Sequence, residues 1–422
     1  MNNCIKNLLN IKDENIYFYE NCVENKKINN VETKLIHGIL TYYPSFCPVC
    51  GCVNNSCQDI IKWGFKHNCI IKLPKLSGYN AILLLDKQRF LCRNCNKTFI
   101  ASTSVVNKNC NISNSTNLQI QISLTKKISE KDIAKDNNVS VSKVDEILNV
   151  ISQHPILRHQ QLPLVMNWDE FKATKDTKGG MAFIITDPIK KNIFDIQDNR
   201  FTKDLEKYFS RFSRQDRNKV KLISMDMYEP YIILAHKMFK NANIVIDRFH
   251  LVIQAYNALN ITRVKLMKHN PKNYNKFKRY WKLILKNKFD LDDKSKKYSS
   301  NFGKEVTQKY IVDYLINTDK SFKASYDVYQ AIINSIKDKD FIKFKTIIHA
   351  KNDLLSDNMK QTIKTYIHFE QYIENSFYYD INNGIIEGTN NLIKCIKRIA
   401  FGYKRFDHFV ARIMLIKGLL IN

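Results

Sequence analysis

The sequence contains no run of eighteen apolar residues, which excludes a membrane-spanning helix of the usual length. Its first segment, MNNCIKNLLNIKDENIYFYE, has acidic and polar side chains where a secretory signal peptide requires an apolar stretch. Internal repeats are also missing. Because 44% of the 422 residues are hydrophobic and 11% are aromatic, extensive disorder is excluded as well. We therefore expect a cytoplasmic protein of roughly two to four domains that does not contact a membrane.

Acidic residues are scarce relative to basic ones. The chain has 40 Asp and Glu against 67 Lys and Arg, which gives a net charge of +27 and favours a polyanionic partner such as DNA. Between Arg263 and Lys288 there are ten basic residues and no acid, interleaved with Tyr274, Phe277, Tyr280 and Trp281. Two interpretations remain open for this run: a solvated helical face, or a surface that neutralises phosphates.

Cysteines are almost absent after Cys95, since nine of the eleven lie at or before that position. Without a secretory signal, such clustering indicates metal binding rather than disulfides. Two C-x-x-C pairs place four thiolates on two tight turns, which suits tetrahedral Zn²⁺. The four predicted zinc ligands are Cys47, Cys50, Cys92 and Cys95.

The predicted zinc ribbon extends over residues 41–105, with two or three strands between the cysteine pairs. Gly51 suits the first knuckle, where a left-handed backbone is often needed. Cys52 and Cys57 are spare, and either could replace one of the four ligands. The alternative is a set of reduced cysteines that bind no metal.

Two helices are predicted in the segment that follows. Residues 1–40 are expected to be a short helical or irregular lead-in, and Val106 to Asn117 a polar linker. In ISEKDIAKDNNVSVSKVDEIL, Ser129 can cap a first helix, and a second helix enters at Ser140 or Ser142. The spacing predicts a helix-turn-helix over 118–152, with Ser140, Ser142 and Lys143 facing DNA. An ordinary pair of antiparallel helices is the alternative.

From Pro163 onward the chain has the pattern of an α/β domain. The runs LPLVMNWDEF, MAFIITDP and NIFDIQD predict three successive strands. A helix near 203–212 follows, then KVKLISMDM (strand), EPYIILAHKMF (helix) and ANIVIDRFH (strand). This order is typical of a ribonuclease-H-like fold. After His250 the pattern is helical to the end, with no further strand expected.

Two acids stand at the ends of predicted strands, Asp169 after LVMNW and Asp226 after VKLISM. Phosphodiester chemistry with two Mg²⁺ ions requires carboxylates that converge from separate elements. Each acid taken singly could instead be a turn or cap residue. A third candidate, Glu387, shares one face of a helix closing at Gly402 with Asn391, Lys394 and Arg398. Ile393, Ile396 and Ala400 lie on the side expected to pack inward.

The chain resembles the ISL3 family of bacterial insertion-sequence transposases nearly from end to end. The matching blocks are, in order, CPVCG, RFLCRNCNKTF, the two helices, WDEF, SMDMYEPY, NANIVIDRFHLV and NGIIEGTNNLIKCIKRIAFGYKRFDHFVARI. The resemblance implies a DDE transposase in which Asp169, Asp226 and Glu387 are the catalytic residues and bind Mg²⁺ or Mn²⁺. It places Asp247 and His250 next to the active site, where Asp247 could otherwise cap a helix or pair with Arg248.

The resemblance also implies a domain order after the helix-turn-helix: a catalytic core over 160–257, an all-helical insertion over 258–375, and the final core helix and C-terminus over 376–422. Lys394, Lys397 and Arg398 are then expected to contact DNA, as is the basic run. The implied reaction is hydrolysis at each end of the element, followed by attack of the freed 3′-hydroxyls on target DNA, in a homodimer or larger assembly. The alternatives are a DNA-binding regulator without chemistry and a domesticated nuclease.

Overall fold

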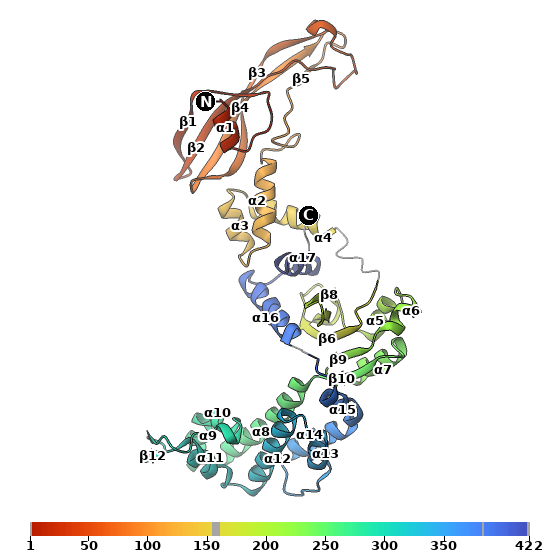
Figure 1. Ribbon diagram of the computed structural model, residues 1–422. Coiled ribbons are helices and arrows are strands. Elements are labelled where there is room, and N and C mark those ends of the chain that lie inside the picture. Colours follow the sequence, from red (N-terminus) through yellow and green to blue (C-terminus); the bar gives the residue numbers. More distant parts are fainter. Residues whose placement is uncertain (1, 154–160, 382–383, 420–422) are drawn as a thin grey trace. The chain divides into compact units, whose positions relative to one another are not determined.

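The computed structural model describes residues 2–153, 161–381 and 384–419 (Figure 1). The chain divides into two compact units. The first combines residues 1–156 with the C-terminal residues 393–422, and the second contains residues 157–392. No helix among the described residues is both long enough and apolar enough to cross a membrane.

A five-stranded sheet forms the N-terminal part of the first unit. After helix α1 (Asn2–Leu8) come β1 (Ile16–Ile28), β2 (Val31–Leu40), β3 (Ile60–Leu76), β4 (Tyr79–Cys92) and β5 (Thr98–Ile100). The strand order is β1-β2-β4-β3, β2 is parallel to β4, and β5 pairs with β4. The expectation of a helical or irregular segment over 1–40 is therefore wrong, because most of it forms two long strands of the same sheet as the cysteine-rich segment.

Four helices complete the first unit: α2 (Asn114–Leu124), α3 (Glu130–Asp136), α4 (Val141–Gln153) and α17 (Phe406–Ile416). The pair predicted as a helix-turn-helix is present, and Ser129 caps α3 by accepting a hydrogen bond from the backbone N–H of Asp132. The expected linker is shorter than predicted, since α2 already begins at Asn114 behind its cap Ser113.

Helix α17 shares a hydrophobic core with α2, α3 and α4, to which it contributes Ala411 and Leu415. Arg412 is buried, and its guanidinium donates hydrogen bonds to the carbonyls of Leu124, Lys126 and Ile128. These carbonyls lie at the end of α2 and in the loop after it, where helical partners are lacking. The C-terminus, predicted to belong to the catalytic core, thus packs with the helix-turn-helix pair.

The second unit is built on a mixed five-stranded sheet of order β10-β9-β6-β7-β8. The strands are β6 (Val165–Lys172), β7 (Met181–Asp187), β8 (Asn192–Gln197), β9 (Leu222–Met225) and β10 (Asn243–Ile246). Strands β6, β7 and β8 are antiparallel, whereas β6, β9 and β10 are parallel. Helices α5 (Thr202–Phe209), α6 (Arg214–Lys219) and α7 (Glu229–Met238) connect them. The predicted succession of strands and helices is confirmed.

A helical segment then extends from the sheet. It contains α8 (Arg248–His269), α9 (Tyr274–Arg279), α10 (Trp281–Ile284), α11 (Gln308–Ile316), α12 (Lys320–Lys337), α13 (Phe341–His349), α14 (Asp357–His368) and α15 (Glu370–Tyr378). It is not wholly helical, because β11 (Lys297–Ser299) and β12 (Lys304–Val306) form a short antiparallel hairpin. Helix α16 (Gly384–Ile399) follows and closes at Gly402, whose φ of +100° fits the predicted glycine stop.

Candidate active site and metal-binding clusters

Three aspartates stand at the same level of three adjacent parallel strands: Asp226 and Asp247 directly after β9 and β10, and Asp169 within β6, just beyond its pairing with β9. Strand β6 pairs with β9 through Asn167 and Ser224, so two residues further along Asp169 comes level with Asp226. Strand β10 pairs with β9 through Ile246 and Met225, and the next residue after each strand is again an aspartate. Because carboxyl ends of parallel strands meet at one sheet edge, Asp169, Asp226 and Asp247 line a common pocket.

Asp169 is the most enclosed of the predicted catalytic acids. Its Oδ1 accepts a hydrogen bond from the backbone N–H of Glu170 at 2.7 Å, and its Oδ2 accepts one from Asn390 Nδ2 at 2.6 Å. Burial is the main cause that raises the pKa of Asp169 to about 6. The nearby charge of Asp226 acts in the same direction, and the two hydrogen bonds oppose both. A positive charge placed in the pocket would stabilise the ionised form.

His250 lies between the other two aspartates. Its Nδ1 is 2.6 Å from Asp226 Oδ1 and 3.1 Å from Asp247 Oδ2. Burial lowers the pKa of His250, but hydrogen bonds and charge from the two carboxylates outweigh it and raise the pKa to about 10. These three side chains also offer ligand atoms within 4.8 Å of one another. The protonated imidazole therefore lies between the two carboxylates, where its positive charge balances theirs.

Asp247 also contacts the start of α8. Its carboxylate accepts a hydrogen bond from the backbone N–H of Phe249 and caps α8. Arg248 does not pair with it but with Asp380, at 2.7 Å. Asp247 therefore caps the helix, which was one of the alternatives, and does not pair with Arg248, which was another. It also lies in the pocket with the predicted catalytic acids.

Helix α16 brings its first turn to the same pocket. Ile386 lines it, and Asn390 donates to Asp169. Glu387 lies between these two positions in the sequence, and its side chain is exposed. The cluster of close ligand atoms among the described residues contains neither Glu387 nor Asp169. The structure therefore places Glu387 beside the site without a direct contact to the two aspartates.

The remaining residues of α16 follow the predicted faces in part. Asn391, Lys394 and Arg398 are exposed with Glu387, whereas Ile393 and Ile396 are buried. Lys397 is half-buried instead, and its ammonium lies 5.7 Å from the ring centroid of Phe409 in α17. The side chains of Lys394 and Arg398 are therefore accessible to a ligand, whereas that of Lys397 is partly covered.

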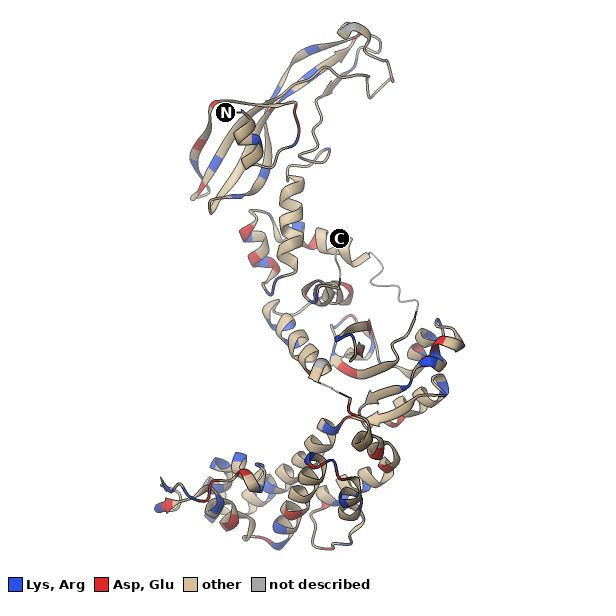
Figure 2. Ribbon diagram, viewed as in Figure 1, with Lys and Arg blue, Asp and Glu red and all other residues tan. Residues whose placement is uncertain are grey.

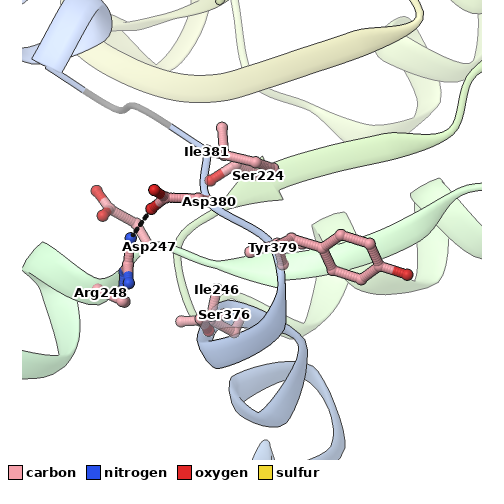
Figure 3. Close-up of a pocket in the computed structure, with 9 residues that line it drawn as sticks. Ser224, Ile246, Asp247, Arg248, Ser376, Tyr379, Asp380 and Ile381 are labelled. Carbon is pink, nitrogen blue, oxygen red and sulfur yellow. Dashed lines mark hydrogen bonds and ion pairs between the residues drawn. The ribbon is translucent and has the colours of Figure 1, made fainter. Parts of the chain in front are cut away.

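A cavity of about 380 Å³ adjoins Asp247 on its other side (Figure 3). Arg248 points across its mouth to Asp380, which also pairs with Lys339 at 3.2 Å. These ion pairs tie the chain just after α15 to the start of α8 and to the residue two positions after α12.

The residues of the pocket fit a divalent cation. Asn167 is 1% exposed, lines the pocket with Asp169 and Asp226, and neither atom of its amide has a hydrogen-bond partner among the described residues. Carboxylate and amide oxygens are ligands that Mg²⁺ and Mn²⁺ prefer, often through water. A hydrated ion would supply the partner that this buried amide lacks.

The four predicted zinc ligands form a second cluster in the first unit. Their sulfurs lie within 4.8 Å of one another, and the closest pairs, Cys47–Cys95 and Cys50–Cys92, are 3.8 Å apart. Gly51 has a φ of +76°, as the knuckle requires. The backbone N–H of Cys52 lowers the pKa of Cys50 to about 7. The donor set fits Zn²⁺, and neither spare cysteine belongs to the cluster.

Of the three residues at the start of α4 that were predicted to face DNA, Ser140 and Lys143 form contacts within the protein. Ser140 accepts a hydrogen bond from the backbone N–H of Lys143, and Lys143 pairs with Glu146 at 3.0 Å. Ser142 is exposed. The exposed face of α4 also carries Asp145, whose carboxylate pairs with His408 of α17 at 3.1 Å. This helix is therefore nearly neutral at its surface and not strongly basic.

The aromatic residues of the basic run belong mainly to the core. Phe277 is fully buried, and Tyr280 and Trp281 pack against the large core of the second unit. Arg263 is also buried and donates to the carbonyl of Phe277. Of the four interleaved aromatic residues only Tyr274 is exposed, so the alternation of basic and aromatic residues reflects helix packing rather than a surface for stacking bases.

Comparison with known proteins identifies the family of the chain. A family profile described as Transposase, that of the ISL3 group of DDE transposases, matches residues 167–413, which is more than half of the chain. The chain belongs to the ISL3 transposase family. The matched range begins two residues before Asp169, ends within α17 and includes every candidate carboxylate. The predicted family membership is confirmed.

Two curated relatives of this transposase-family chain are similar over parts of their length. The transposase for insertion sequence element IS1001 of Bordetella parapertussis is 25% identical over 255 residues, 58% of this chain and 59% of the relative. A protein named ATP-dependent protease from Lactococcus lactis subsp. lactis is 28% identical over 127 residues, 30% of this chain and 41% of the relative. The chain thus matches less than two thirds of the length of either relative.

Proposed function

We propose that this chain is a DNA transposase that cuts phosphodiesters at the ends of an insertion sequence and joins the 3′-hydroxyls to target DNA. The single observation that carries the proposal is the convergence of Asp169, Asp226 and Asp247 at one sheet edge, with the first turn of α16 beside them. The order of the sheet, three antiparallel strands flanked by two parallel ones, supports a ribonuclease-H-like catalytic core.

Asp169, Asp226 and Glu387 would hold two Mg²⁺ or Mn²⁺ ions. Such ions, when bound, activate the attacking water or 3′-hydroxyl and stabilise the leaving oxygen. The chain itself orients the carboxylates. Asn390 holds Asp169 through its Oδ2, and His250 bridges Asp226 and Asp247. Ile386 of α16 lines the pocket and would exclude part of the bulk water.

DNA contacts would come from several parts of the chain. Lys394 and Arg398 extend along the exposed face of α16 beyond Glu387, where they can meet the backbone near the cut phosphate. The zinc cluster and the helix pair α3–α4, through Ser140, Ser142 and Lys143, would help to recognise the terminal repeats. Because two ends are processed together, we expect a homodimer or a larger assembly.

The test is cleavage of a duplex that carries the end of the element, in Mg²⁺, by the wild type and by Asp169→Asn, Asp226→Asn and Glu387→Gln. Each variant should lower the cleavage rate by at least about a thousandfold, since each removes a metal-ligand charge. Binding of the same duplex should stay near the wild-type level. Wild-type cleavage by any of the three variants would show that the residue is not catalytic. Glu229→Gln, an exposed acid at the start of α7, is the matched control and should cleave normally.

A further inference from the structure

The far end of the helical segment carries a dense group of cations. Residues 263–309 contain fifteen Lys and Arg against four Asp and Glu. Figure 2 shows Lys and Arg along α9 and α10 and on the β11–β12 hairpin next to them. Six exposed members of this group are called the basic tip here: Lys278, Arg279, Lys282, Lys294, Lys296 and Lys297.

The cations of the basic tip form no ion pairs with carboxylates of the described residues. Elsewhere in the second unit, exposed cations such as Lys237, Lys343 and Lys345 pair with carboxylates. None of the six side chains of the basic tip does so within the described residues. Nearby rings hold some of them in place without cancelling their charge, because Lys278 lies 5.9 Å from Tyr274 and Lys282 lies 5.6 Å from Trp281. Unpaired cations that are held together indicate a polyanionic partner.

The hairpin is fixed to α9 and α10. Arg279 donates to Ser300 Oγ at 3.1 Å, and the hydroxyls of Tyr280 and Ser299 are 2.6 Å apart. Ser299 faces inward and is buried, while Lys297 and its neighbours in the loop before β11 are exposed. Asp292 accepts hydrogen bonds from the backbone N–H groups of Lys294 and Ser295, and the charge of Lys297 helps to lower its pKa. The basic tip is therefore a preformed surface.

Helix α8 connects the active-site pocket to the basic tip. Asp247, at the pocket, caps its first turn, and its last residue, His269, leads into the cationic region. With 22 residues α8 extends about 33 Å at 1.5 Å per residue. One turn of B-DNA is about 34 Å, or roughly ten base pairs. Helix α8 contains no Asp or Glu, so no carboxylate on it would repel a duplex lying alongside.

We propose that the basic tip binds the backbone of the same DNA duplex about one helical turn away from the phosphate that is cut. This inference rests on the proposed function, because the length of α8 is counted from Asp247 at the proposed catalytic pocket. Phosphates one helical turn apart lie on the same face of the duplex, so a protein can contact both from one side. The tip would therefore orient the duplex in the pocket and add affinity without reading its sequence.

The test uses the full chain and three duplexes that carry the end of the element. One extends only about five base pairs on either side of the cut phosphate. The others extend about twenty base pairs on the flanking side or on the element side. The variant is K294Q/K296Q/K297Q, and the matched control is K337Q/K351Q/K364Q, which removes the same charge from exposed lysines elsewhere in the helical segment. Binding is measured as a function of salt concentration.

On one of the long duplexes the hairpin variant should bind more weakly than the wild type. The slope of log K against log salt should be smaller by about one for each lysine that touches a phosphate. On the short duplex the two should bind alike, and the control should bind every duplex like the wild type. A loss on the flanking or the element side identifies which arm the tip holds.

Wild-type binding by the hairpin variant on both long duplexes would overturn the inference, as would an equal loss in the control. A second variant, K278Q/K282Q, tests the α9–α10 side of the same surface and should behave like the first. Binding needs no cleavage, so the result is independent of the Asp226→Asn test. Failure of the tip and failure of the catalytic assignment can therefore be told apart.

Discussion

Asp169, Asp226 and Asp247 meet because β6, β9 and β10 are parallel neighbours in register. Asp226 follows directly after β9, as its position after an apolar run predicted, whereas Asp169 lies within β6, which continues to Lys172. The register between β6, β9 and β10 is set by backbone pairing between segments about 20 to 60 residues apart, which no local pattern encodes. Asp247 was accordingly expected only next to the site, whereas it lines the pocket itself.

Asn390, like Asn167, is a residue of the site that sequence reasoning missed. It lies one helical turn after Glu387 in the block EGTNN, where an asparagine on a polar helix face has nothing to distinguish it from a solvated residue. Only the packing of α16 against the sheet shows that its amide reaches Asp169.

Replacing Asn390 by Ala should lower the rate of DNA cleavage roughly ten- to a hundredfold, because residues that hydrogen-bond to metal-binding side chains have effects of this size. The Mg²⁺ concentration needed for half-maximal cleavage should rise as well, which a purely structural defect would not require. Asn391→Ala is the matched control, since Asn391 is the exposed neighbour on the same helix. Equal effects of the two substitutions would contradict this role for Asn390.

Strands β7, β9 and β10 of the second unit were predictable because their residues are mostly apolar and because an Asp ends β7 and directly follows β9 and β10. Strands β1 and β2 could not be predicted in this way. Strand β1 is largely exposed and polar, with only Ile16 and Cys22 buried, and a bulge between Phe18 and Val23 breaks its alternation. It is held by pairing with β2, and β2 in turn by β4, which is a tertiary effect rather than a local propensity.

Helix α17 shows the same limit at longer range. Its apolar face predicts a buried helix but not its partner, which lies more than 250 residues earlier in the chain. Arg412 could not be recognised as a buried residue either, because arginine is mostly exposed unless it is paired. Its contacts with the carbonyls after α2 offset the cost of burying its charge.

The zinc cluster leads to a prediction about the N-terminal sheet. Cys92 is the last residue of β4 and is buried among the four sulfurs, so Cys92→Ser should reduce the zinc content from about one ion per chain to near zero. Affinity for the ends of the element should fall with it. Zinc is measured by elemental analysis of the purified protein. Cys57→Ser is the control, because that exposed cysteine lies outside the cluster, and a full zinc content in Cys92→Ser would exclude the site.

Each of the two units is assembled from, or interrupted by, distant segments of the chain. The first is completed by residues 393–422, and the second receives its helical segment between β10 and α16. Helix α16 belongs to both, since the division falls at Ile393, six residues after Glu387. The predicted order over residues 41–152 follows from local patterns, and the insertion over 258–375 was implied by the family resemblance. Neither predicts this return of the C-terminus. The family profile nevertheless spans both units, as expected if they act as one enzyme.

The central claim is that Asp226 and its neighbours bind the divalent ions that cut DNA. It is tested most directly by Asp226→Cys, assayed for cleavage of the element's end in Mg²⁺ and in Mn²⁺. A thiolate is a poor ligand for Mg²⁺ and a better one for Mn²⁺. We expect Asp226→Cys to be inactive in Mg²⁺ and to regain cleavage in Mn²⁺, while Asp226→Ala stays inactive in both. Wild-type cleavage by Asp226→Cys or Asp226→Ala in Mg²⁺ would contradict the claim.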